Sequence, residues 1–164
     1  MQFAKDSFYM ALRARLATVN PGRTLAIGGA TRPAVVVDEN EYPTARPALP
    51  DCFHLQWGEA RTVAGMARAQ RPLMQAECRI FYRTSGDDSG ATRGRSLAEF
   101  DLELLQMCTP PRTAKCDFTH TPEVALGGTV FWSGLEFLAA ESKPGELQRN
   151  ARLLIFFFPE VDYS

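Results

Sequence analysis

The sequence has few of the residues that carry metal and thiol chemistry. It contains only two histidines, His54 and His120, and its four cysteines include no C-x-x-C pair. A zinc site needs such ligands gathered in one place, usually in closely spaced pairs. We therefore predict that the chain has no metal site. The cysteines are expected to be free and mostly buried as small hydrophobic residues; they are Cys52, Cys78, Cys108 and Cys116.

Motifs for phosphate binding and nucleophilic catalysis are also missing. Gly28-Gly29 is not followed by the Lys-Ser/Thr of a phosphate loop, and a hairpin turn is expected there. Ser89 lies between an acid and a glycine, not in a G-x-S-x-G elbow. The adjacent acids Asp87 and Asp88 lack the ligand spacing of a calcium loop. The sequence thus predicts no catalytic residue, no cofactor and no bound metal.

Charge of one sign does not accumulate along the chain. The formal net charge is −1, which gives no electrostatic reason to expect binding to nucleic acid or to a membrane. Lysine is scarce, so arginine supplies most of the 18 basic residues. The planar guanidinium suits arginine to protein interfaces. A general compositional preference for arginine explains the same count.

Long apolar runs are absent as well. The first residues have neither the basic segment nor the apolar stretch of a signal peptide, so a reducing cytoplasm is the expected compartment. The apolar run at 153–158 is too short to span a bilayer. Its β-forming residues end at Pro159 and predict a strand buried on both faces.

Two segments have the period of an amphipathic helix. Phe8, Leu12 and Leu16 recur at four-residue intervals and predict one buried helical face. Asp6 or Ser7 is expected to cap this helix, which should end at 20–22, Asn-Pro-Gly.

The second helix is expected to begin at a capping box formed by Ser96 and Glu99. The pair Pro110-Pro111 should end it. Its predicted buried stripe consists of Leu97, Phe100, Leu104, Leu105 and Cys108.

The remaining segments favour strands. Residues 23–27 and 31–37 flank the glycine pair and predict a hairpin. Residues 52–57 alternate in a way that places His54 on an exposed face, and 72–84 form a longer alternating strand. Further strands are expected near 113–119, 129–138 and 148–158. The predicted fold is α+β, with a mainly antiparallel sheet packed against two helices in a single domain, 1–164.

Candidate functional residues lie on the polar face of strand 72–84 and in two loops. The strand offers Glu77, Arg79 and Arg83. The segments near 38–51 and 85–94 are expected to be flexible loops able to order on a partner. The alternative for the strand is a solvated sheet face. The candidate loop residues for an interface are Asp38, Glu39, Glu41, Asp87 and Asp88.

Several stretches together resemble the tail terminator family of long-tailed bacteriophages. These are 8–16 with Asn20-Pro21 after it, 32–39 running into an acidic Pro-rich loop, and 53–58. The order of elements that follows is also similar. The resemblance implies a homo-oligomer, a hexameric ring at the head-proximal end of the tail tube. Such a ring stops tube polymerisation and offers a surface to the head connector.

The resemblance also implies the partners and the location. The partners are the tail tube protein and the head–tail connector or stopper protein. Genomic DNA passes through the ring without sequence-specific binding, and no membrane is involved. The protein is expected in the virion tail or neck, and in the host cytoplasm during assembly. No catalytic residue is implied.

Three alternatives remain from the sequence. The chain fits another neck or tail-completion subunit, which shares its size and class. It also fits a small enzyme or ligand-binding domain, with a pocket lined by Phe131 and Trp132 and with His54 as base. An interaction module unrelated to phages is the third.

Overall fold

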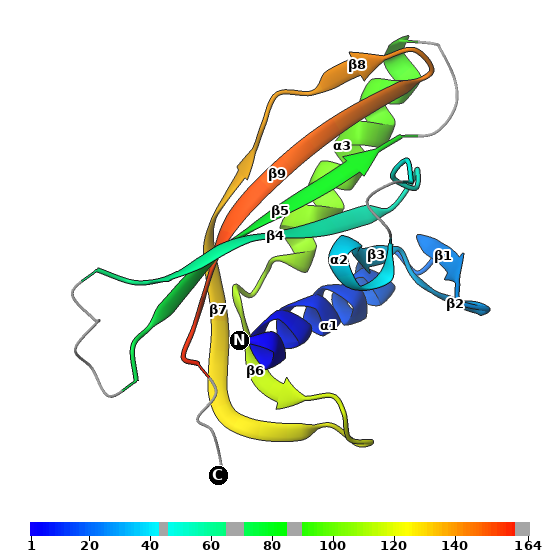
Figure 1. Ribbon diagram of the computed structural model, residues 1–164. Coiled ribbons are helices and arrows are strands. Elements are labelled where there is room, and N and C mark those ends of the chain that lie inside the picture. The colour runs from blue at the N-terminus through cyan, green and yellow to red at the C-terminus, as the bar shows by residue number, and fades with distance from the viewer. Residues whose placement is uncertain (43–45, 65–70, 85–89, 160–164) are drawn as a thin grey trace.

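A computed structural model describes residues 1–164 except 43–45, 65–70, 85–89 and 160–164. Figure 1 shows the helices and strands of these described residues. In chain order they are α1 (Gln2–Val19), β1 (Thr24–Ile27), β2 (Ala30–Pro33), β3 (Val35–Val37), α2 (Asp38–Glu41), β4 (Phe53–Thr62), β5 (Met74–Arg83), α3 (Gly90–Met107), β6 (Arg112–Asp117), β7 (Val124–Phe137), β8 (Glu141–Lys143) and β9 (Glu146–Phe157).

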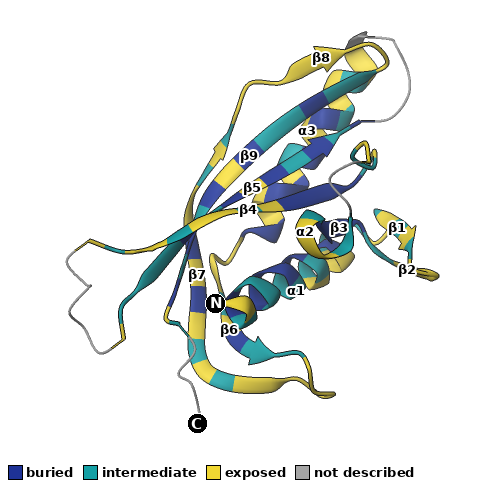
Figure 2. Cartoon of the chain, in the orientation of Figure 1, coloured by how far each residue is buried: buried dark blue, intermediate teal, exposed yellow. Residues whose placement is uncertain are grey.

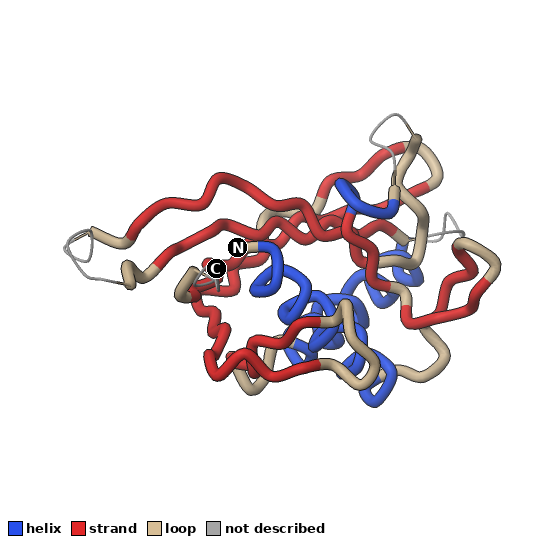
Figure 3. The backbone as a smooth tube through the Cα atoms, turned by 60° about the horizontal axis from the view of Figure 1, so that its bottom comes forward, coloured by secondary structure: helices blue, strands red, loops and turns tan. Residues whose placement is uncertain are grey.

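Seven strands form the main sheet, in the order β3-β4-β5-β9-β7-β6 with β8 on β9. Every pair is antiparallel except β3 with β4, which is parallel. The sheet curls, and Figure 3 shows the two long helices lying together on the inside of the curve. The fold is therefore mixed, with an antiparallel-rich sheet, as the sequence predicts.

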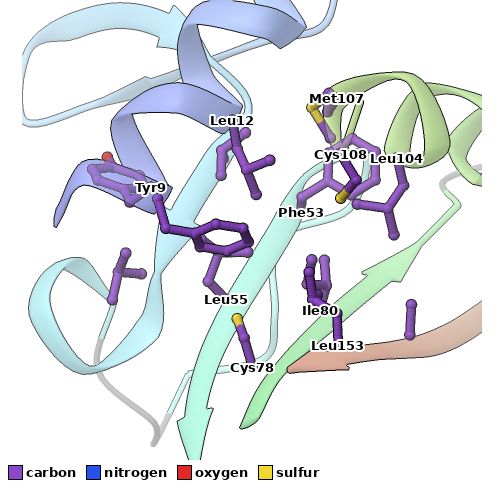
Figure 4. Packing of buried hydrophobic residues seen from close by; sticks show 14 of the residues in the cluster. Tyr9, Leu12, Phe53, Leu55, Cys78, Ile80, Leu104, Met107, Cys108 and Leu153 are labelled. Carbon is purple, nitrogen blue, oxygen red and sulfur yellow. The ribbon is translucent and has the colours of Figure 1, made fainter. Parts of the chain in front are cut away.

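The core lies between the inner face of the sheet and the helices α1 and α3. Phe8, Leu12 and Leu16 of α1 are fully buried, which confirms the predicted helical face. Figure 4 shows side chains from α1, β4, β5, α3 and β9 converging there. Burying large side chains such as these contributes roughly 1.5–3 kcal/mol each.

Strand β9 is central in the sheet but is not buried on both faces. Leu153, Ile155 and Phe157 are buried against the helices, whereas Leu154 and Phe156 on the other side are only half-buried. Figure 2 shows this alternation along the sheet. The sequence-based prediction was wrong here because the long helices α1 and α3 cover only the inner face of β9.

The predicted hairpin forms, but its second strand is shorter than expected. β1 pairs with β2 around Gly28 and Gly29, whose φ angles of 60° and 79° suit glycine. The strand breaks at Ala34, whose N–H donates to the carbonyl of Arg23 at 3.0 Å. Residues beyond this point form β3, which joins the main sheet instead.

Helix α1 begins at Gln2, well before the predicted caps Asp6 and Ser7. The Ser7 hydroxyl is used elsewhere: it donates to the carbonyl of Phe3 at 2.6 Å and accepts from the Cys116 N–H at 2.9 Å. Ser7 thus joins α1 to the edge of β6. The predicted C-terminal boundary at Asn20 is confirmed.

Helix α3 also begins earlier than expected, at Gly90, so Ser96 and Glu99 lie within it and form no capping box. Residues 90–94 are therefore helical and not part of a loop. Leu105 is 51% exposed, while Met107 is buried. Leu105 follows the buried Leu104 by one residue, which is about 100° around a helix, and so it leaves the core face.

The acidic segment after β3 is not a continuous loop. Residues 38–41 form the short helix α2, and Tyr42 and Leu49 pack against the core. The Tyr42 hydroxyl donates to the carbonyl of Pro47 at 2.8 Å, and the Leu49 carbonyl lies 3.3 Å from His54 Nε2. The expected loop is therefore replaced by a helix at 38–41, and Tyr42 and Leu49 have partners within the chain.

Candidate interaction surface

The outer face of the main sheet, opposite the helices, carries the first of the predicted functional residues. Antiparallel register places side chains of β5, β9 and β7 in rows across this face. We call this set the open face; its rows are Arg79, Arg152 and Glu136, then Glu77, Leu154 and Ser133, then Gln75, Phe156 and Phe131.

Both signs of charge are present on the open face. Arg79 donates from Nε to Glu77 Oε1 at 2.9 Å, and Arg152 donates from Nε to Glu136 Oε2 at 2.9 Å. The side chains of Arg79 and Arg152 are 64% and 47% exposed. Exposed pairs of this kind contribute only about 0–1 kcal/mol to stability. Their positions suit recognition more than folding.

The far row of the open face is aromatic. The rings of Phe131 and Phe156 stack with centroids 5.4 Å apart and an angle of 12° between their planes. Phe131 is 37% exposed, although it lies in the sheet. Leu154 lies between this aromatic pair and the charged row. The face therefore passes from charged to apolar along the strands.

Two bulges hollow the surface on either side of Glu77 and Leu154. One lies in β4 between Trp57 and Ala60, and the other lies in β7 between Ser133 and Glu136. Hollows of about 400 Å³ and about 180 Å³ adjoin these bulges. Bulges bend a strand and redirect its side chains. The two bulges thus leave hollows in the open face, into which side chains of a partner can fit.

Arg83, the third predicted residue of the strand, makes its contacts outside the open face. Its guanidinium donates to Glu146 and, through Nε, to the carbonyl of Ala48 at 2.7 Å. Arg83 thus fastens the segment before β4 to the start of β9. Glu77 and Arg79 lie together on the open face, whereas the contacts of Arg83 join other parts of the chain.

The acids of α2 are engaged within the chain. Asp38 accepts from His54 and Gln56, at 2.7 and 2.9 Å, and Glu39 pairs with Lys5 at 3.3 Å. Glu41 accepts from the hydroxyl of Tyr9, the guanidinium of Arg32 and the N–H of Val37. Through these contacts the three residues hold α2 against α1, β2 and β4. Asp87 and Asp88 lie outside the described residues.

Burial of Glu41 by itself favours the neutral carboxyl group, but its hydrogen bonds outweigh this. The pairs with Arg32, the Val37 N–H and Tyr9 leave the pKa of Glu41 below its ordinary value. Burial and the bond to Glu41 together raise the pKa of the Tyr9 phenol. The network is thus stable with Glu41 charged and Tyr9 neutral.

His54 is fully buried, not exposed as the strand alternation predicts. It points to the outer face of β4, where Asp38, the carbonyl of Leu49 and the ring of Tyr42 cover it. These three residues precede β4 in the chain, so alternation within the strand gives no sign of this cover. Both ring nitrogens of His54 have partners, which does not suit the catalytic base of the enzyme alternative.

The pocket of that enzyme alternative does not form. Trp132 and Phe131 are neighbours in β7 and lie on opposite faces of the sheet. Trp132 is buried, donates from Nε1 to the carbonyl of Cys108 at 2.9 Å and meets Phe8 edge to face. Phe131 lies on the open face. The two aromatic rings cannot line one cavity.

The cysteines are free thiols, as predicted, and three of the four are buried. Burial raises the pKa values of Cys52 and Cys108 to about 12 and that of Cys78 well above its usual range. Across the described ranges, His, Cys, Asp and Glu side chains form no group of three that could hold a metal ion. No helix in this part of the chain is long and apolar enough to cross a membrane.

Sequence reasoning missed the residues that complete the open face. Arg152, Leu154 and Phe156 alternate with buried residues along β9, and Glu136 lies between two half-buried residues of β7; this period was the available signal. In β9 it was hidden because both sides of the strand are mostly apolar. Their proximity to Glu77 depends on pairing between distant segments.

Comparisons with known proteins find similarity at the level of structure and not of sequence. No protein-family model matches the chain, and no curated protein matches it. Among solved structures, a chain of the "Virion of native gene transfer agent (GTA) particle" aligns over 94% of this chain and 94% of its own length. The identity is 15% and the TM-score is 0.40. At these values the resemblance carries no function over to this chain.

Proposed function

We propose that this chain is a structural subunit of a phage-like virion and acts as a tail terminator. The observation that supports the proposal is the open face of the sheet. It combines paired charges of both signs with Leu154 and the exposed Phe131. The long helices α1 and α3 lie on the opposite face of the sheet. Mixed polar and aromatic surfaces of this kind are typical of protein interfaces. The family resemblance of the sequence supplies the particular role.

In this role, copies of the chain form a ring, a hexamer by resemblance, on the end of the tail tube. The ring stops addition of the tail tube protein and receives the head connector, while DNA passes through its lumen. Arg79 and Arg152 are then interface residues. Paired charges across such a contact give orientation and specificity more than affinity.

The direct test is assembly of tail tubes in the presence of the protein. Tail tube protein from the same virus is polymerised with and without this chain, and tube lengths are measured by negative-stain microscopy. We expect shorter tubes of uniform length, each with a ring on one end. Tubes of unchanged length without end rings would contradict the terminator role. Rings bound to connectors but not to tubes would instead indicate another neck subunit.

A further inference from the structure

Helix α3 has a second apolar side that faces solvent. Its core side is fully used by Leu97, Phe100 and Leu104. On the opposite side, Leu102 and Leu105 are 55% and 51% exposed. A surface helix of a globular protein ordinarily keeps polar residues on its outer side. Two large exposed leucines, three residues apart on one helix face, indicate a surface that another chain covers.

On the outer side of α3 and on the open face, a charged residue is followed along the chain by two apolar residues. Along α3, the exposed Glu99 precedes Leu102 and then Leu105. Along β9, Arg152 precedes Leu154 and then Phe156. The helix stretch is roughly 9 Å long at 1.5 Å per residue. The strand stretch is roughly 13 Å long, so the two have comparable lengths.

The charges at the two ends are complementary. Arg79 and Arg152 are directly opposite each other across β5 and β9, an arrangement of like charges that is unfavourable by itself. Glu77 and Glu136 each balance one of them from the side. Each guanidinium donates to its glutamate through Nε and stays largely exposed, so its remaining N–H groups can donate to a carboxylate of another chain, and Glu99 stands at the matching position on α3.

From these observations we infer that the outer side of α3 in one copy packs on the open face of the next copy. Glu99 meets Arg79 and Arg152, and the two leucines cover Leu154 and the stacked Phe131 and Phe156. The inference rests on the proposed function and specifies the contact between copies. The two surfaces differ, so the contact is heterologous, and each copy offers one of each. Such contacts close into a ring when the rotation between copies permits.

Two variants separate the two halves of the contact. The helix variant, Leu102→Lys with Leu105→Lys, changes exposed positions to a good helix former. The sheet variant is Arg79→Glu with Arg152→Glu. Matched controls on other exposed positions are Val124→Lys, which is 48% exposed, and Lys143→Glu in β8. Thermal melts within a few degrees of the wild type establish that each variant is folded.

The decisive experiment mixes the two variants. Sedimentation velocity over a series of concentrations measures the size of the species formed by each variant alone and by the mixture. We expect each variant alone to be monomeric, while both controls assemble like the wild type. In the mixture, α3 of the sheet variant still fits the open face of the helix variant. The mixture should therefore give one-to-one dimers and no larger species. Adding Glu99→Arg to the sheet variant should restore its assembly, because an arginine on the helix then meets the two new carboxylates at 79 and 152.

Two outcomes would overturn the contact alone. A helix variant or sheet variant that assembles like the wild type would do so, and so would a mixture that stays monomeric while the wild type forms rings. The proposed assembly role would survive both results. A wild-type chain that remains monomeric at every concentration would count against the contact and against the ring together.

Discussion

Arg79 and Arg152 lie directly opposite each other on β5 and β9, and each donates to a different carboxylate at 2.9 Å. The like charges are therefore balanced within the subunit, by Glu77 and Glu136. Both guanidinium groups remain largely exposed. Because exposed pairs add little to stability, these four residues are free to serve a contact between chains.

Truncation of Leu104 and of Leu105 should have very different effects. Leu104 is fully buried in the core, so Leu104→Ala should lower the free energy of unfolding by about 2–5 kcal/mol. Leu105 is 51% exposed, so Leu105→Ala should change the stability of the subunit by less than about 0.5 kcal/mol. Urea denaturation of both variants measures the difference. Equal losses would mean that α3 is rotated relative to the structure.

Removal of Asp38 should destabilise the fold, unlike removal of its neighbour Glu39. Asp38→Ala leaves the buried ring of His54 without its partner at Nδ1, which costs about 1–3 kcal/mol. Glu39 makes one exposed pair with Lys5, so Glu39→Ala should cost at most about 1 kcal/mol. Thermal melts compare the two variants. If Glu39→Ala were the more damaging change, the described docking of α2 would be wrong.

The network around Glu41 should make stability fall in acid. Its pKa lies below the ordinary value of 4.5 in the folded chain, so the carboxylate stabilises the fold above about pH 4.5. That contribution is lost as the pH falls through the folded pKa. Glu41→Gln should therefore be less stable than the wild type at neutral pH, and the difference should shrink below about pH 4.5. Denaturation curves at several pH values test this; a constant difference would contradict it.

Cys116 should be the most reactive of the described thiols. It is half-buried, whereas Cys52, Cys78 and Cys108 are buried. With a pKa of about 12, Cys52 is thiolate in roughly one molecule in ten thousand at pH 8. A thiol reagent should label one site in the native protein and all four after unfolding. Cys116→Ser should abolish the native labelling. Rapid labelling of a buried cysteine in that variant would count against the core packing.

The elements with a clear local period could be predicted from the sequence. The buried face of α1 and the alternation of β5 depend on residues a few positions apart, and both are confirmed. The burial of His54 could not be predicted, because its cover comes from Asp38, Tyr42 and Leu49, which lie outside its strand. Leu105 was assigned to the core because a buried stripe read from apolar residues alone includes both sides of α3.

Only part of the candidate surface could be predicted from the sequence. Glu77 and Arg79 share one alternating strand and could be found from its polar face. Arg152 and Glu136 join them through strand pairing over long separations, which no local pattern encodes. Alternation placed Arg83 on the same face of the strand, but alternation does not give the partners of its guanidinium group, which are Glu146 and the carbonyl of Ala48.

The mass of the assembly formed by purified protein is the most direct measure of the central claim, that the open face joins copies of this chain. Native mass spectrometry of the wild type should give one closed ring, of six copies if the family resemblance holds. Arg79→Glu with Arg152→Glu should give the mass of a single chain at an unchanged melting temperature. A double variant with the same ring mass as the wild type would show that this face is merely solvated.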